Sequence, residues 1–201
     1  MNHSRPDDAY DLQELWQRFK GWLQLHAPGD YGTLHPGASR EKISRLESDI
    51  GFPLNGDLKA LLAMSDGVVQ RVSSMDPGAF ILGYSLLGTV EILEGQRYLS
   101  SMAEGFVEDG YEEAVGRIAH TRWVPFAQGV TGDVLFVDHR DGHFGEVGEM
   151  SFGSPEYQLL WPGLGLMLRD LCSAVEGMTG LPEIGVYPLV HEGRMLEWPT
   201  L

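Results

Sequence analysis

Residues 123–147 read WVPFAQGVTGDVLFVDHRDGHFGEV, and the rest of the chain is arranged around this stretch. Residues 134–137 are an unbroken apolar run of strand formers, short enough for a strand that is buried on both faces. Residues 123–127 predict an earlier strand, in which Pro125 suits a strand end or edge because proline has no N–H to donate. The dipeptide Asp141-Gly142 predicts a tight turn into a third strand. The sequence therefore predicts a β-meander of three strands.

Helical patterns lie on both sides of the predicted meander. Apolar residues recur at steps of three and four in the segments 12–23, 43–50, 58–64 and 164–175. Asp7 or Asp8 is expected to cap the first helix, because an aspartate side chain accepts hydrogen bonds from the free N–H groups at a helix start. Ser39 and Asn55 are expected to cap the next two helices, and Gly51 is expected to end the earlier of these two.

The remaining segments are less regular. Residues 68–72 and 80–82 are expected to form short strands, and Thr89 is expected to cap a helix that frays by Gly105. We expect two further features toward the C-terminus, a loop at 151–155 and a late hairpin within 187–198.

The composition is typical of a soluble cytoplasmic protein. The chain has 201 residues, enough for one domain with a good core, and its single cysteine, Cys172, rules out an internal disulfide. Cys172 lies on the inner face of the last predicted helix, where we expect a buried apolar residue rather than a nucleophile. No apolar run approaches the roughly 18 residues needed to cross a bilayer, and residues 1–10 are too polar for a secretory signal.

The formal net charge is −15, and it is unevenly distributed. Residues 98–168 hold eleven carboxylates against three basic residues, so this middle third carries −8 of the total. Such a field disfavours nucleic acid and anionic membranes as partners, and it speeds encounter with a basic protein. The alternative is a general acidity without a specific role, because charge asymmetry alone is a weak guide.

Residues 104–113 are the most acidic part of this region. They contain no lysine or arginine, and aromatic residues lie among the carboxylates. This combination suits recognition of a basic protein surface, in which peripheral charges steer the partner and aromatic side chains anchor it. The candidate contacts are Glu104, Glu108, Asp109, Tyr111, Glu112 and Glu113. A solvated helix end or a flexible loop is the alternative interpretation.

Signatures of catalysis are mostly absent from the sequence. It has no Gly-x-Ser-x-Gly elbow, no P-loop, no His-Glu-x-x-His motif and no Cys-x-x-Cys pair. The weak metal candidates are His139 and His143, which flank a predicted turn near Asp138 and Asp141 and are expected to reach one face. Polar residues at a hairpin tip need no ligand, however, and no third histidine is expected nearby. We therefore expect no catalytic residue, no bound metal and no cofactor.

Three segments carry a family resemblance. The first is 36–53 (PGASREKISRLESDIGFP), the second is 57–67 (DLKALLAMSDG), and the third is 123–138 followed by GEV at 145–147. In this order they resemble the SUKH superfamily, in particular its Smi/Knr type, and the third segment is the most specific. The motif residues are expected to be structural: Gly51, Pro53, Asp66, Gly67, Trp123, Pro125, Gly132, Asp133, Asp138 and Gly145.

The resemblance implies an α+β fold, in which a small mixed or antiparallel sheet with a central β-meander is packed by helices in a single domain. We assign this domain to residues 1–180, with the matched core at about 36–150. Residues 181–201 are expected to be a C-terminal extension packed on the same domain. The segment 104–119 and the tail after Gly180 depart from the short members of the family, which leaves the binding partner open.

The resemblance also implies protein binding without catalysis. Many bacterial members look like immunity proteins that neutralise polymorphic or contact-dependent toxins, and fungal relatives regulate cell-wall glucan synthesis. Our main hypothesis is an immunity-type protein that blocks a basic toxin domain through its acidic surface. The alternatives are a regulatory scaffold of the fungal kind and a metal-dependent enzyme built on His139 and His143.

Overall fold

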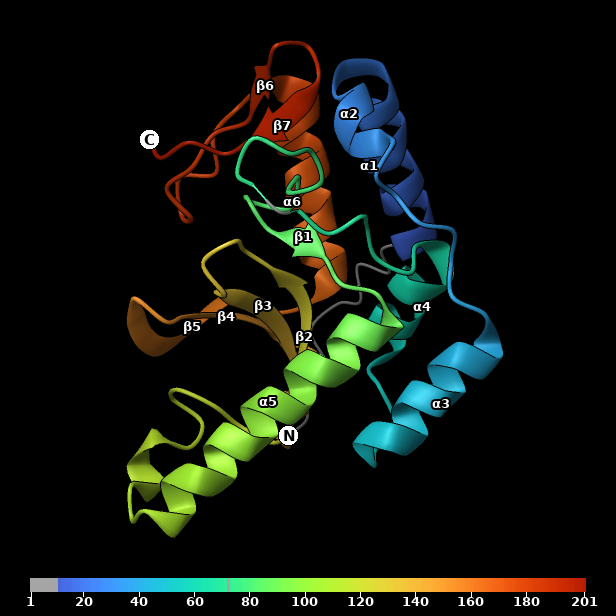
Figure 1. Cartoon of the computed structure of the whole chain (residues 1–201). Coiled ribbons are helices and arrows are strands. Elements are labelled where there is room, and N and C mark those ends of the chain that lie inside the picture. The colour runs from blue at the N-terminus through green and yellow to red at the C-terminus, as the bar shows by residue number, and fades with distance from the viewer. Residues whose placement is uncertain (1–10, 72) are drawn as a thin grey trace, which may run out of the picture.

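The computed structural model describes residues 11–71 and 73–201 and shows an α+β fold (Figure 1). The strands are β1 (Ser85–Leu86), β2 (Trp123–Gln128), β3 (Val134–Asp138), β4 (Val147–Ser151), β5 (Ser154–Trp161), β6 (Leu189–His191) and β7 (Met195–Glu197). The helices are α1 (Leu12–His26), α2 (Pro28–Tyr31), α3 (Arg40–Ile50), α4 (Gly56–Met64), α5 (Thr89–Glu108), the short 3-10 helix η1 (Glu112–Ala114) and α6 (Leu164–Gly177). One antiparallel sheet has the order β1-β2-β3-β4-β5, and β6 pairs with β7 separately. The predicted fold class is confirmed, and β2, β3 and β4 are the predicted meander.

The strand β3 is buried on both faces, as its apolar run predicts. Side chains alternate along a strand, so Leu135 and Val137 point to one face of the sheet while Val134 and Phe136 point to the other. The first pair joins a large core cluster with the buried sides of α1, α3, α4 and α6. The second pair joins a smaller cluster with Trp123 and residues of α5. Helices therefore cover both faces of the sheet.

The caps of α3 and α4 confirm the predicted boundaries. The Ser39 side chain accepts a hydrogen bond from the Lys42 N–H at 3.3 Å, and the Asn55 side chain accepts one from the Asp57 N–H at 2.9 Å. Gly51 ends α3 with a φ of +84°, in the left-handed region that glycine adopts without strain.

The first helix begins later than predicted. Its cap is Asp11, whose side chain accepts hydrogen bonds from the N–H groups of Gln13 and Glu14. The expected caps, Asp7 and Asp8, lie outside the described residues. The buried stripe of α1 faces α6 (Figure 1), and the Cys172 thiol is buried there and donates to the carbonyl oxygen of Leu15 at 3.3 Å.

The helix α5 is longer than predicted, because it passes Gly105 and ends at Glu108. A glycine inside a helix costs about 1 kcal/mol relative to alanine. Packing outweighs this cost, since Leu99 and Ala103 are buried in the smaller cluster and Phe106 packs against it. In Figure 1 the second half of α5 extends past the edge of the sheet.

Two expected strands are wrong, and two strands, β1 and β5, were missed. Residues 68–71 and 80–82 contribute only isolated bridges, Leu34 with Val68 and Ile81 with Tyr84. Residue 72 lies outside the described residues. The expected loop at 151–155 is a two-residue turn that leads into β5. This edge strand is largely exposed, so it lacks the buried apolar pattern by which strands are recognised.

The turn after β3 is wider than Asp141-Gly142 alone predicts, because the return strand begins only at Val147. Gly142 does adopt a φ of +84°. The loop is closed farther down, where Gly145 donates to the Asp138 carbonyl and Asp138 donates to the Glu146 carbonyl, both at 2.8 Å. The local dipeptide bends the chain, but these backbone hydrogen bonds fix where the next strand starts.

Residues 181–201 pack against the N-terminal helices and the loop after α4. The expected late hairpin is present as β6 and β7. Asp30, buried in α2, accepts hydrogen bonds from the Leu196 N–H at 2.6 Å and the Gly78 N–H at 2.7 Å. Trp198 belongs to the large core cluster, and its indole N–H donates to the Phe80 carbonyl at 2.9 Å.

Candidate docking surfaces

The end of the meander is fixed by a buried aspartate. Asp138 is fully buried, and its carboxylate accepts hydrogen bonds from the Trp123 indole at 3.1 Å and from Arg140 Nη2 at 2.7 Å. Trp123 stacks on Phe136, with ring centroids 4.2 Å apart, and Arg140 lies over the indole at 5.5 Å. These residues lie at the ends of two paired strands, where Trp123 is the register partner of Asp138. The motif tryptophan and aspartate thus form one structural unit.

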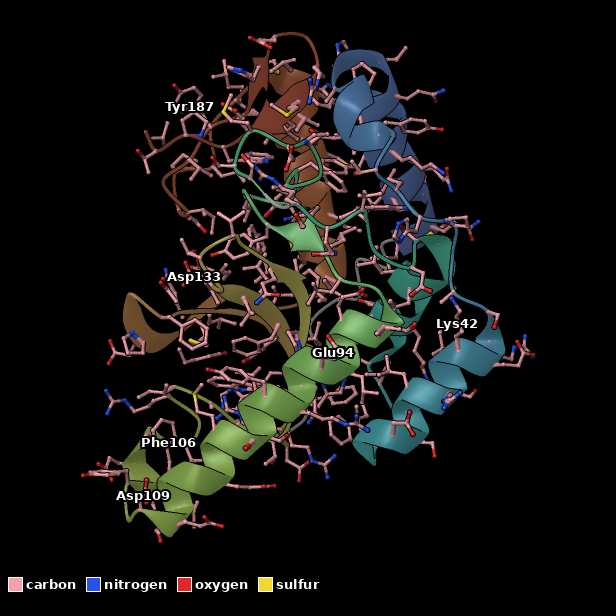
Figure 2. All side chains as sticks on the ribbon, viewed as in Figure 1. Lys42, Glu94, Phe106, Asp109, Asp133 and Tyr187 are labelled. Carbon is pink, nitrogen blue, oxygen red and sulfur yellow. The ribbon has the colours of Figure 1, made fainter. Side chains whose placement is uncertain are left out.

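The motif residues Asp66 and Gly67 connect α4 to the start of α5. The Asp66 carboxylate accepts from the Thr89 N–H at 2.7 Å and from Lys42 Nζ at 2.9 Å. Asp66 therefore caps α5 from a distant part of the sequence. The N-cap position of α5 itself holds Gly88, which has no side chain to accept a hydrogen bond. Figure 2 shows Lys42 on the neighbouring helix α3. Gly67 has a φ of +80° and lies directly against the Gly88 backbone.

The remaining motif residues also serve backbone geometry. Asp133 accepts from the Phe152 N–H at 2.8 Å and the Thr131 hydroxyl at 2.7 Å, so it joins the β2–β3 turn to the β4–β5 turn. Gly132 and Gly145 have positive φ values of +92° and +91°. Pro125 lies inside β2, not at its end, at a bulge that β1 does not reach. Its missing N–H therefore costs the sheet no hydrogen bond on that side.

The two histidines of the hairpin do not form a metal site. His139 is buried, its Nε2 accepts from the Asn55 N–H at 2.8 Å, and its Nδ1 lies 3.0 Å from the Val137 carbonyl. His143 is exposed and lies 2.8 Å from Glu146. The expectation that both rings reach one face is wrong, because the wide loop turns His139 toward α4. Across residues 11–71 and 73–201, no three metal-ligating side chains cluster.

The pKa of His139 is lowered, mainly because burial penalises the charged ring. The unfolded chain therefore takes up a proton before the folded chain does as the pH falls through about 6.5. Stability that is present at neutral pH should be lost below that value, by up to about 1.4 kcal/mol per pH unit for one proton. In urea unfolding between pH 7.5 and 5.5, the free energy of unfolding of His139→Gln should depend less on pH than that of the wild type. His143→Gln controls for the loss of a histidine, and an unchanged slope in His139→Gln would contradict a buried neutral ring.

The acidic arm, defined as residues 104–113, is the exposed end of α5 with the turn that follows. All six predicted contact residues on it are exposed. Figure 2 shows Phe106 and Asp109 at this end, far from Tyr187 at the opposite end of the molecule. The arm is held by the Tyr111 N–H, which donates to the Phe106 carbonyl at 2.7 Å. Two apolar side chains, Val107 and Tyr111, are more than half exposed among the carboxylates.

A second surface, which we call the arginine groove, lies at the Arg122 end of β2. Its volume is about 480 Å³, within the range of ligand-binding clefts. The lining residues are Phe52, Pro53, His120, Arg122, His139, Arg140, Asp141 and Phe144. Of these, the sequence had indicated Pro53 as a motif residue and His139 as a metal candidate. One feature of the sequence could have pointed to this groove, because Arg122 and Arg140 are two of only three basic residues in the acidic middle third, residues 98–168.

The meander, its helices on both faces and the ordered glycine, tryptophan and aspartate positions define an α+β module of the SUKH type. Residues 37–170, about two thirds of the chain, match the model of the SMI1 / KNR4 family (SUKH-1), and the chain belongs to this family. None of the helices in the described part is long and apolar enough to span a membrane.

Two curated relatives are distant but consistent with this membership. A KNR4/SMI1 homolog of Kluyveromyces lactis is 27% identical over 115 residues, which cover 56% of this chain and 22% of the relative. The cell wall biosynthesis/cell cycle regulator smi1 of Schizosaccharomyces pombe is 24% identical over 156 residues, which cover 69% of this chain and 30% of the relative. The chain thus spans less than a third of the length of either relative.

Proposed function

We propose that this chain is a cytoplasmic protein-binding module without catalytic activity. It binds a basic domain of another protein through the acidic arm, and the role that fits this best is that of an immunity protein that neutralises a polymorphic or contact-dependent toxin. Membership in the SUKH-1 family supports protein binding. The single, buried Cys172 fits a reducing compartment.

The main support for this proposal is that the carboxylates of the acidic arm have no side-chain partners among the described residues. In the described part of the chain, none of its five carboxylates forms a side-chain hydrogen bond or an ion pair, although ion pairs occur on several other surfaces. Their charges are therefore not neutralised by the residues that the structure describes. They can accelerate association with a basic surface, since complementary charge acts mainly on the on-rate.

The arm also has the other components of a binding surface. Tyr111 supplies an exposed aromatic ring, and Val107 an exposed aliphatic side chain beside it. Phe106 packs against the smaller core cluster, which holds the arm in place before binding. A surface that is ordered in advance loses less conformational entropy on binding. We expect Tyr111 to be the anchor and the carboxylates to surround it.

A regulatory scaffold is the second candidate function, because the curated relatives are named as a KNR4/SMI1 homolog and as a regulator of cell wall biosynthesis and the cell cycle. The scaffold would use the same arm to hold a basic region of another protein. The genomic neighbourhood separates the two roles. A toxin-like coding sequence directly upstream favours immunity, whereas neighbouring genes of wall synthesis favour the scaffold.

The double variant Glu108→Lys/Glu112→Lys is expected to slow association with the partner at least about tenfold at low salt, because steering by the arm is reversed. The partner is first isolated by affinity capture from the native cytosol and identified by mass spectrometry. Stopped-flow measurements at several salt concentrations then give the on-rates. The variant should also show a flatter dependence of the on-rate on salt.

The matched control is Glu183→Lys/Glu192→Lys, which changes the net charge equally at two exposed positions of the C-terminal segment. This control should reduce the on-rate far less, because the C-terminal segment lies at the opposite end of the molecule from the arm (Figure 2) and salt screens charges over such separations. Equal on-rates for the arm variant and the wild type would contradict the assignment of the arm as the docking surface.

A further inference from the structure

The arginine groove places two guanidinium groups at the same end of the sheet. Arg122 immediately precedes β2, and Arg140 follows β3, its antiparallel neighbour. The backbone joins them, because the His139 N–H donates to the Arg122 carbonyl at 2.9 Å. Arg140 is held rigidly, since its Nε and Nη2 both donate to Asp138. The fold thus fixes one arginine and leaves the other exposed beside it.

Several hydrogen-bond donors along this groove have no acceptor within residues 11–71 and 73–201. The Arg122 guanidinium lies over the Phe52 ring at 4.5 Å and pairs with no carboxylate there. Arg140 uses Nε and Nη2 but not Nη1. His120 Nδ1 accepts from the Arg122 N–H at 2.9 Å, which leaves the ring proton on Nε2, again without a partner. Donors of this kind suit an anionic acceptor.

Aromatic side chains form the other part of the groove. Phe52 lies under Arg122, and Phe144 is 59% exposed, with its ring edge-on to the His139 ring at 5.5 Å. Pro53 is exposed next to Phe52. An exposed phenylalanine beside a proline and a free guanidinium offers apolar contact and hydrogen bonds within one site, the combination that is typical of binding clefts.

The charges in the groove favour a carboxylate over a phosphate group. Arg140 is neutralised by Asp138, and Asp141 adds a negative charge at the rim. Arg122 is therefore the one cation of the groove that is not compensated, which is too little to hold a doubly charged phosphate against a chain of net charge −15. One carboxylate beside an apolar side chain matches one such arginine and an aromatic wall.

We propose that the arginine groove is a second docking surface, which binds a segment of a partner protein in which one carboxylate lies next to an aromatic or aliphatic side chain. The carboxylate accepts from Arg122 and Arg140 Nη1, and the apolar side chain lies against Phe52 and Phe144. This surface is distinct from the acidic arm and recognises a single anionic group instead of a basic surface, so the inference does not depend on the function proposed for the arm.

The test is a titration of the ¹⁵N-labelled full chain with the capped peptide QDFNQ, which carries one carboxylate, followed by amide chemical shifts. The amides of Phe52, Arg122 and Phe144 are expected to shift, and the neutral peptide QNFNQ is expected to leave them in place. Arg122→Gln should weaken binding about tenfold or more, because a hydrogen-bonded charge pair is lost. Phe144→Ala, at an exposed position, should weaken it by a smaller factor, and the spectra of both variants show directly whether they are folded.

Three results would overturn the groove as a peptide site. These are unchanged groove amides at about 5 mM QDFNQ, equal shifts with both peptides, and shifts produced by inorganic phosphate at a lower concentration than by QDFNQ. The arm variant Glu108→Lys/Glu112→Lys should bind QDFNQ at least as well as the wild type. The proposals for the acidic arm and for the groove are therefore tested by separate measurements.

Discussion

Replacement of Asp138 by alanine is expected to lower the free energy of unfolding by about 4 kcal/mol. Removal of one partner from a buried ion pair costs about 3–5 kcal/mol, and the value for Arg140 should lie toward the lower end because its side chain is 21% exposed. The Trp123 indole also loses its acceptor, which adds about 1–3 kcal/mol for a buried donor. Urea unfolding, followed by tryptophan fluorescence, measures the change.

Asp138→Asn separates the two contributions, because the amide oxygen can still accept from the indole while the charge is lost. We expect it to cost about half as much as the alanine variant. Glu156→Ala is the control for a lost ion pair at the surface, since the Arg117–Glu156 pair is more than half exposed on both sides, and it should cost at most about 1 kcal/mol. If Asp138→Ala also lowered the free energy of unfolding by only about 1 kcal/mol, the buried aspartate would not be what holds the end of the meander in place.

Replacement of Gly67 by alanine is expected to lower the free energy of unfolding by about 4 kcal/mol as well, for a steric reason. The φ of +80° would cost a residue with a Cβ about 1–2 kcal/mol. The added Cβ would also lie 2.4 Å from the Gly88 nitrogen and 2.8 Å from the Leu87 carbonyl carbon, so backbone would have to move, at a further cost of about 1–3 kcal/mol.

Gly51→Ala is the matched control for this prediction. Gly51 has nearly the same φ, +84°, but an added Cβ would have no neighbour within 4 Å. It should therefore show the conformational cost alone, about 1–2 kcal/mol. The difference between the two variants in urea unfolding measures how closely the α4 end approaches the start of α5. Equal losses would mean that this close approach contributes nothing to stability.

The acidic arm can be predicted from the sequence, whereas the arginine groove depends on the tertiary structure. The acidic arm follows from composition, since residues 104–113 are acidic in any conformation and their exposure only makes the charge usable. The arginine groove could not be predicted in this way, because Phe52 comes from the segment after α3, whereas Phe144 and the two arginines come from the ends of β2 and β3 and the loop before β4. Those segments are distant in sequence and meet only through the pairing of strands.

The sequence alone determined the elements in which local chemistry dominates. The apolar run at 134–137 specified a strand buried on both faces, Ser39 and Asn55 specified two helix starts, and Gly51 specified a helix end. In each case the deciding interactions lie within a few residues, so that side-chain period, cap and turn residues are sufficient.

Only the tertiary structure decided the features that depend on distant partners. Asp66 caps a helix 23 residues away, His139 accepts from a backbone N–H 84 residues away, and β5 is a strand because β4 offers it hydrogen bonds. The sequence shows which side chains carry donors, acceptors and charges. Folding decides which of them satisfy one another and which, like Arg122 and the carboxylates of the acidic arm, have no ion-pair partner among the described residues.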